Sequence, residues 1–335
     1  MRKYGFNMQW MFISSGYGQD KREPAPPNLR ELDFIAKRDF NFIRVPLDYR
    51  FWTNGFDYLN PNEKTLEIID TYLEACRERG LHMCINMHRA PGFCVNNNLT
   101  EKHNLWTDIE AQDGFVFIWE YFAKKYKGIS SDILSFNLLN EPKEINNNGL
   151  TRNNHEKIMR RTINAIRAID PSRQIIIDGY GGGDYALPEL ADTNTVHSGR
   201  GYAPWTLSHY KADWMGIEYD WADKCTYPHL LDGVIWDKAQ LKKHYEPWRE
   251  VERQGVKVFK GEIGSYNNTP NDVFLKWMAD VLDIYREYKW GYALWQFNGS
   301  YGVVDHGKPG GKYEVIDGFN VDRALLEMLM ENRGN

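Results

Sequence analysis

The chain has 335 residues, of which 42% are hydrophobic and 26% are charged, and its net charge is −5 with a pI near 6.0. This length supports a large core and lies within the range of single-domain α/β barrels. Nucleic acids and anionic membranes are disfavoured as partners, because the chain lacks the basic field that releases counterions on binding. A neutral partner fits the composition better.

Aromatic residues make up 14% of the chain, and their flat faces can pack on sugar rings, on other ligands or in a bulky core. The four cysteines, at positions 76, 84, 94 and 225, show no metal-ligand spacing, so we expect free buried thiols and no metal or cofactor. Residues 1–12 lack the apolar region of a signal peptide, and no stretch is long enough to span a bilayer. We therefore expect a cytoplasmic protein, or a secreted one whose leader is absent from this sequence.

Strand and helix patterns alternate along the chain in an order typical of a parallel α/β fold. The strands are expected near residues 4–8, 42–46, 81–87, 133–139, 175–177, 193–202, 256–261 and 292–295. Apolar stripes of helical period fall between most of them, and a last stripe follows the eighth strand. The sequence therefore predicts one (β/α)₈ TIM barrel over residues 1–335. Residues 203–237 show little periodicity, and we expect them to form a long loop over the substrate cleft.

Two glutamates follow short apolar runs that read as buried strands. Glu141 comes after the fourth run and Glu262 after the seventh. The carboxyl ends of barrel strands are where such enzymes keep their chemistry, and two facing carboxylates are the equipment for cleaving a glycosidic bond. The residues alone therefore predict a glycoside hydrolase.

Several short motifs at the predicted strand ends resemble glycoside hydrolase family 5, the cellulase family of clan A. The resemblance runs in order along nearly the whole chain and is closest to compact intracellular-type endoglucanases. Its motifs are Gly5-Phe6-Asn7, Phe42-Ile43-Arg44-Val45-Pro46, Asn86-Met87-His88, Leu139-Asn140-Glu141-Pro142, Tyr202, Ser208-His209-Tyr210, Gly261-Glu262-Ile263-Gly264 and Leu294-Trp295.

The resemblance implies a retaining endo-β-1,4-glucanase that acts on β-glucan as a monomer without a cofactor. Glu262 would be the nucleophile and Glu141 the acid/base, with carboxyls about 5–5.5 Å apart. Arg44 and Tyr202 would keep Glu262 ionised. The remaining substrate contacts would come from Asn140 on the sugar 2-hydroxyl, His88 on a neighbouring hydroxyl, Trp295 as the floor under that sugar, and His209 with Trp205 from the long loop.

The chain departs from the family at Arg200, which stands two residues before Tyr202 where the family usually has histidine. A guanidinium that points into the cleft would add a fixed positive charge near Glu262. The alternative is an outward arginine paired with a loop acid such as Asp213.

Other functions stay open at the level of the sequence. Within the family, a β-mannanase or an exo-acting β-glucosidase is the alternative, since the fold does not decide the substrate. From another class, the chain could be a carbohydrate-binding protein without turnover. The glycines at positions 179 and 181–183 could cradle a phosphate, but they lack the accompanying motifs and read better as a flexible loop after the fifth strand.

Overall fold

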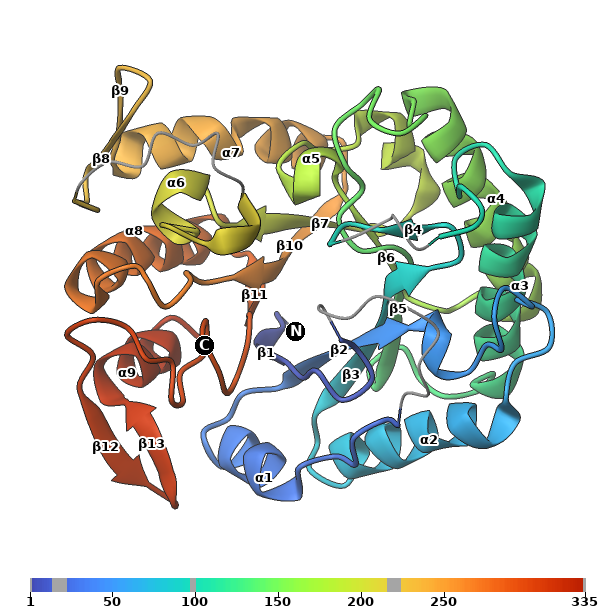
Figure 1. The fold of residues 1–335 in the computed structure, drawn as a ribbon, viewed down its shortest axis with the longest axis horizontal. Coiled ribbons are helices and arrows are strands. Elements are labelled where there is room, and N and C mark those ends of the chain that lie inside the picture. The colour runs from blue at the N-terminus through green and yellow to red at the C-terminus, as the bar shows by residue number, and fades with distance from the viewer. Residues whose placement is uncertain (1, 14–22, 97–100, 216–223, 334–335) are drawn as a thin grey trace.

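A computed structural model describes residues 2–13, 23–96, 101–215 and 224–333. Within these ranges, eight parallel strands pair edge to edge, and the pairing of β2 with β3 closes them into a barrel (Figure 1). The barrel strands are β1 (Tyr4–Asn7), β2 (Phe42–Asp48), β3 (His82–Ala90), β5 (Leu134–Asn137), β6 (Ile175–Asp178), β7 (Val196–Gly201), β10 (Lys257–Ile263) and β11 (Gly291–Leu294). The predicted (β/α)₈ barrel is confirmed.

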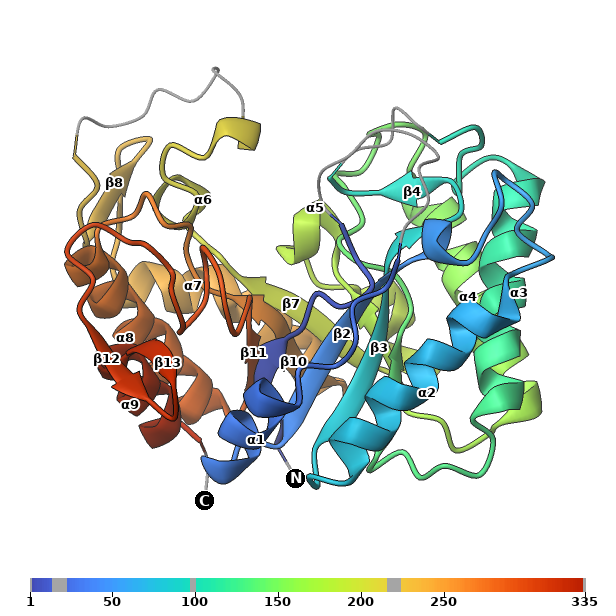
Figure 2. The same cartoon turned by 60° about the horizontal axis from the view of Figure 1, so that its bottom comes forward.

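Helices surround the barrel and short hairpins extend from it, as Figures 1 and 2 show. The helices of the described residues are α1 (Leu29–Lys37), α2 (Glu63–Arg77), α3 (Ile109–Lys125), α4 (Arg152–Ile169), α5 (Tyr180–Gly183), α6 (Trp205–Ser208), α7 (Lys238–Arg253), α8 (Asn271–Tyr288) and α9 (Arg323–Glu331). The short strands are β4 (Phe93–Cys94), which pairs with β3, and the hairpins β8 (His229–Leu231) with β9 (Val234–Trp236) and β12 (Tyr313–Ile316) with β13 (Phe319–Asp322). None of the described helices is long and apolar enough to cross a membrane.

Local side chains fix where several helices begin. Asn28 and Asn62 cap α1 and α2 by accepting from backbone N–H groups of the first turn, and Thr151 with Asn154 forms a capping box on α4. Each such cap satisfies N–H groups that have no partner inside the helix and contributes about 1 kcal/mol. The local sequence therefore determines where these helices begin.

Two of the predicted element boundaries are wrong. The sixth barrel strand was expected from about residue 193, but residues Pro188–Thr193 form a 3₁₀ helix and β7 begins at Val196. The segment 203–237 was expected to be a plain loop, whereas its described part carries α6, a 3₁₀ turn at Asp213–Met215 and the β8–β9 hairpin. Elements of three or four residues are too short to give a hydrophobic period. Residues 216–223 of that segment lie outside the described residues.

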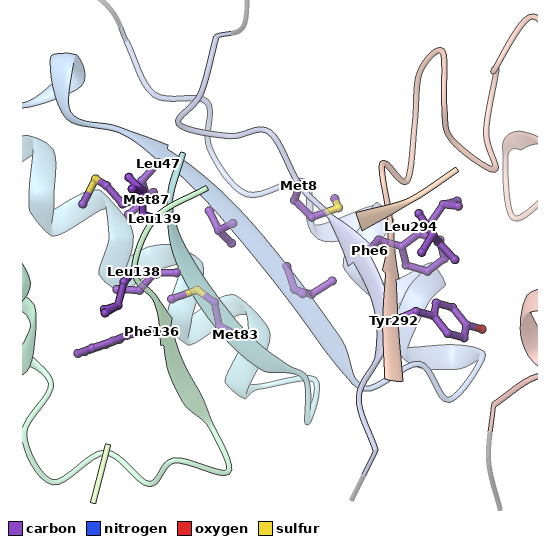
Figure 3. Close-up of a cluster of buried hydrophobic side chains, with 14 of the residues drawn as sticks. Phe6, Met8, Leu47, Met83, Met87, Phe136, Leu138, Leu139, Tyr292 and Leu294 are labelled. Atoms are coloured by element: carbon purple, nitrogen blue, oxygen red, sulfur yellow. The ribbon is translucent and has the colours of Figure 1, made fainter. Parts of the chain in front are cut away.

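The main core lies between the outer face of the barrel and the helices. Alternate side chains of a strand point to opposite faces, so Phe6 of β1 and Leu294 of β11 pack together outside the barrel (Figure 3). Leu47 and Met87, which are register partners on β2 and β3, lie together in the same way. All four cysteines are buried and free, as predicted.

The barrel interior is divided into an apolar floor and a polar upper half. Phe42 of β2 contacts Phe259 of β10 with ring centroids 5.0 Å apart, and since these strands are not neighbours in the sheet, the contact crosses the lumen. Cys84, Ile176 and Ala293 complete this floor. Above it, toward the carboxyl ends of the strands, the inward positions are polar and charged. The fold thus places the ionisable side chains above an apolar layer.

Candidate active site

The predicted glutamates meet at the carboxyl end of the barrel. Glu262 lies within β10, whereas the sequence predicted a position just after the strand. Glu141 lies in the loop that follows β5. Glu141 adopts a left-handed backbone conformation with φ of 49°. This conformation costs a residue with a side chain about 1–2 kcal/mol, so the surrounding contacts must hold it.

A bulge in β10 turns Glu262 toward the lumen. The register with β7 shifts between Lys260 and Glu262, with Gly261 as the extra residue. A Cβ on Gly261 would lie 2.6 Å from Ser198 Oγ and 3.1 Å from Arg200 Nη1. Only glycine fits that gap, and this explains the glycine before the glutamate.

Arg44 of β2 reaches across the barrel to Glu262. Its Nη1 donates to Glu262 Oε1 at 2.7 Å and to Asn7 Oδ1 at 2.9 Å, and its Nε donates to Asn137 Oδ1 at 2.9 Å. Tyr202 donates its hydroxyl to the other oxygen, Glu262 Oε2, at 3.0 Å. One oxygen of Glu262 therefore accepts a hydrogen bond from a cation, and the other accepts one from a phenol hydroxyl.

Arg200 points into the site, so the outward pairing with Asp213 that the sequence left open does not occur. Its Nε donates to Glu141 Oε1 at 2.7 Å, and its Nη2 lies 3.4 Å from Glu262 Oε1. Its side chain is fully buried. Burial alone would lower the pKa of Arg200, but three surrounding carboxylates raise it well above its ordinary value. Arg200 is therefore a permanent cation between the two glutamates.

Asp178, at the last position of β6, is a site residue that the sequence analysis missed. Its Oδ2 accepts from Arg200 Nη2 at 2.5 Å, lies 3.7 Å from Arg44 Nη2 and accepts from the backbone N–H of Glu141 at 3.2 Å. Its Oδ1 accepts from Asn137 Nδ2 at 2.9 Å. The signal in the sequence was an aspartate ending a run of three isoleucines, the same strand-end position that singled out Glu141 and Glu262.

Asn140 and His88 complete the network beside Glu141. Asn140 Oδ1 accepts from Arg44 Nη2 at 2.8 Å and from Arg200 Nη2 at 2.7 Å, which orients its amide nitrogen toward His88 Nε2 at 3.2 Å. His88 must then accept at Nε2 and donate from Nδ1, where Asn86 Oδ1 lies 3.0 Å away. Burial and the nearby arginines hold the pKa of His88 well below its usual value, so the ring is neutral.

The two arginines do not prevent Glu141 from holding a proton. Burial and then the charge of Glu262 raise the pKa of Glu141 to about 8, against the opposing effect of Arg200. At neutral pH the site therefore contains a protonated carboxyl next to Glu262. An acid and a nucleophile need such a difference in protonation state between their two carboxyls.

Aromatic rings form the wall on the β7 side of the site. Tyr202 contacts Trp205 and His209, with centroids 5.5 Å and 5.1 Å apart, and Trp205 donates its indole N–H to Asp184 Oδ2 at 2.6 Å. His209 is buried, and burial lowers its pKa to about 3. The predicted pair Trp205 and His209 is thus brought to the site, where it packs behind Tyr202.

Trp295 is a further aromatic side chain at the site, after β11. It is half-buried directly after β11 and stacks on His88 with ring centroids 5.1 Å apart and planes 21° apart. Phe12 contacts the same imidazole at 4.1 Å. The indole is thereby held against His88, whose Nε2 contacts Asn140, and Trp295 stays partly exposed.

The glycine run after β6 packs closely against neighbouring side chains. Gly181, Gly182 and Gly183 all have positive φ, and a Cβ on Gly183 would lie 2.5 Å from Arg200 Cγ. The glycines therefore let the loop lie against the Arg200 side chain. The flexible loop read from the sequence is, in its described structure, a close-packed support for that arginine.

Comparisons with known proteins identify the family of the chain. Residues 1–300 match the family model described as Cellulase (glycosyl hydrolase family 5). Endoglucanase C of Acetivibrio thermocellus is 28% identical over 295 residues, covering 80% of this chain and 83% of that protein. Cellodextrinase A of Ruminococcus flavefaciens is 24% identical over 281 residues, covering 80% and 78%.

Solved structures show the same architecture. A crystal structure described as that of a glycoside hydrolase is 53% identical, with a TM-score of 0.95 and 100% of both chains covered. The endoglucanase Cel5A of Thermotoga maritima is 20% identical, with a TM-score of 0.76 and 98% of this chain and 96% of that chain covered, and this likeness concerns the fold.

Proposed function

Because the chain belongs to glycosyl hydrolase family 5, the cellulase family, we propose that it is a retaining endo-β-1,4-glucanase. The predicted enzymatic class is confirmed: the chain is a glycoside hydrolase that acts on a glycan. The observation that carries the retaining mechanism is the sharing of one Arg200 guanidinium by Glu141 and Glu262. Contact with one guanidinium brings both carboxyls to one region of the site, and the proposed double displacement needs such a pair about 5–5.5 Å apart.

In this mechanism Glu262 attacks the anomeric carbon while Glu141 protonates the leaving oxygen. The glycosidic bond breaks, and a covalent glycosyl-enzyme forms on Glu262. Glu141, now a carboxylate, takes a proton from water, and that water attacks the anomeric carbon and releases Glu262. The raised pKa of Glu141, about 8, supports its role as the acid.

The surrounding side chains bind and orient the sugar. Asn140 uses one N–H on His88 and has a second N–H for the 2-hydroxyl, a contact that strengthens in the transition state. Trp295 supplies the stacking face under the sugar. His88 was predicted to bind a hydroxyl directly, but both of its ring nitrogens contact asparagines, which supports a role in orienting Asn140.

The choice of an endo-acting glucanase rests on the relatives named endoglucanase, which are more similar to this chain than the relative named cellodextrinase is. Initial rates on β-1,4-glucan, mixed-linkage glucan, mannan and xylan, with product lengths, test the proposal. We expect the highest rate on a glucan, with early products of many lengths. A preference for mannan, or release of only terminal sugars, would contradict it.

A further inference from the structure

Asp178 stands in the site without a part in the chemistry described so far. It is completely buried, and its carboxylate contacts the guanidinium of Arg200 at 2.5 Å and the backbone N–H of Glu141 at 3.2 Å. A buried carboxylate is retained only where partners compensate for its loss of water. The question is what this charge does for the reaction.

We propose that Asp178 and Arg200 act as one unit, in which Asp178 positions the Arg200 guanidinium against Glu141 and balances its charge. Asp178 is thus a positioning residue for the acid/base. The inference rests on the proposed function and deepens it, because it concerns how the same site keeps an acid ready.

The geometry shows how the position is set. Arg200 donates from Nε to Glu141 and from Nη2 to both Asp178 and Asn140. Asp178 therefore fixes the plane of the guanidinium through a different nitrogen from the one that contacts Glu141. Asp178 also accepts from the Glu141 backbone, at the residue whose φ is 49°. One carboxylate therefore fixes both the backbone of Glu141 and the cation that touches its side chain.

Charge balance gives the second part of the argument. Arg44 and Arg200 bring two positive charges, and Asp178 and Glu262 bring two negative charges. The network is then neutral while Glu141 carries a proton. Without Asp178, one buried positive charge would remain, and ionisation of Glu141 would be the nearest way to offset it. The acid would be lost at the pH where it is needed.

Other titratable groups face this unit from every neighbouring element. They are Arg44 from β2, His88 from β3, Asp184 after α5, Tyr202 after β7, Lys260 and Glu262 from β10, and Tyr301 from the segment after β11. Burial raises the pKa of both tyrosines well above the ordinary value, and burial lowers the pKa of Lys260 well below it. Of the groups in contact with Arg200, Asp178 alone is a carboxylate that the proposed chemistry leaves unused.

The test compares Asp178→Asn, Arg200→His and the double variant by the pH dependence of kcat/KM on a cello-oligosaccharide. Asparagine keeps the size and one acceptor oxygen, and it removes the charge and replaces the second acceptor with an amide nitrogen. We expect the alkaline limb, which reports protonated Glu141, to move down by about one pH unit or more in Asp178→Asn. In the double variant, where both charges are gone, the limb should return toward that of the parent enzyme.

A second readout separates this role from a purely structural one. Activated aryl glycosides need no leaving-group protonation, so the glycosylation rate of Asp178→Asn should fall less on them than on cello-oligosaccharides. The matched control is Asp170→Asn, which weakens a buried Asp–Arg pair outside the site, Asp170 with Arg173 at 2.8 Å. It should lower thermal stability and leave the alkaline limb in place.

The outcomes are distinguishable. The inference is overturned if the alkaline limb of Asp178→Asn coincides with that of an active parent enzyme. It is also overturned if the loss of kcat/KM in the double variant equals the product of the losses in the two single variants. If Asp178→Asn does not fold, the double variant decides: the inference requires it to be folded and active. Failure of the parent enzyme to release reducing ends from any β-glycan would instead overturn the proposed function.

Discussion

Arg200 contacts both glutamates through one guanidinium: Nε donates to Glu141 Oε1 at 2.7 Å, and Nη2 lies 3.4 Å from Glu262 Oε1. We expect retention of configuration, because the proposed double displacement forms a covalent glycosyl-enzyme on Glu262 and inverts the anomeric centre twice. Proton NMR of the first product from a cello-oligosaccharide should show the β-anomer before mutarotation. An initial α-anomer would show that the enzyme inverts.

Replacing the nucleophile should abolish turnover without unfolding the protein. Glu262→Gln keeps one oxygen for the Arg44 donor and places an amide nitrogen beside the Tyr202 hydroxyl, but it cannot form the glycosyl ester. We expect kcat to fall on the order of 10⁴-fold or more, in the range seen when hydrolases lose their nucleophile. Thermal unfolding checks the fold, and Glu31→Gln, a buried glutamate of α1 outside the site, is the control. Substantial activity in folded Glu262→Gln would assign the nucleophile elsewhere.

Loss of the acid/base should depend on the leaving group. Glu141→Ala removes the proton donor, which cello-oligosaccharides need and activated aryl glycosides do not. Glycosylation should therefore survive on the aryl substrate, where a slow second step should give a burst of released phenol. Equal losses on both substrates, with no burst, would argue that Glu141 is not the acid/base.

The substitution Arg200→His should move both limbs of the kcat/KM profile to higher pH. A cation favours the charged form of each carboxyl, so its replacement by a ring that is neutral near pH 7 disfavours ionisation of Glu262 and of Glu141. The alkaline limb, which starts from a Glu141 pKa of about 8, should move further than the acidic limb, because Arg200 lies closer to Glu141. Unmoved limbs would mean that Arg200 has no electrostatic effect on either glutamate.

The sequence predicted those parts of the site that follow from strand-end placement. Glu262 and Asn140 follow apolar runs, and Arg44 is a charged residue inside one. Parallel strands bring their carboxyl ends to one rim. The barrel itself was predictable for the same reason, since its strands are apolar runs separated by helical stripes. The exceptions were the start of β7 and the short elements of 203–237, which carry no period.

The sequence could not predict which side chains contact one another within the site, because these contacts depend on distances across the lumen. Arg200 was expected to act on Glu262, yet its closest carboxylates are Asp178 and Glu141. Asn7, Asn86 and Asn137 were missed as functional residues because an asparagine in a strand carries no distinctive signal. They orient the charged groups without adding charge, a role visible only once their partners are known.

A row of aromatic rings continues from the site to the surface and predicts a binding site for longer chains. Tyr202 contacts Tyr301, Tyr301 contacts Tyr266, and Tyr266 contacts Trp214, with centroids 6.1, 5.6 and 4.6 Å apart. Trp214 is 58% exposed, so its face is open to a ligand. A sugar stacked on it would gain about 0.5–1.5 kcal/mol, which corresponds to a roughly two- to tenfold effect on KM.

Trp214→Ala should therefore raise KM for long cello-oligosaccharides by that factor and leave KM for short aryl glycosides unchanged, because short substrates do not reach the outer end of the row. Trp214→Phe keeps an aromatic face and should restore much of the lost affinity. Equal KM values for Trp214→Ala and the parent enzyme on every chain length would remove Trp214 from the substrate path. A loss shared by short and long substrates would instead show that Trp214 acts on the site through Tyr266 and His209, the rings that it contacts.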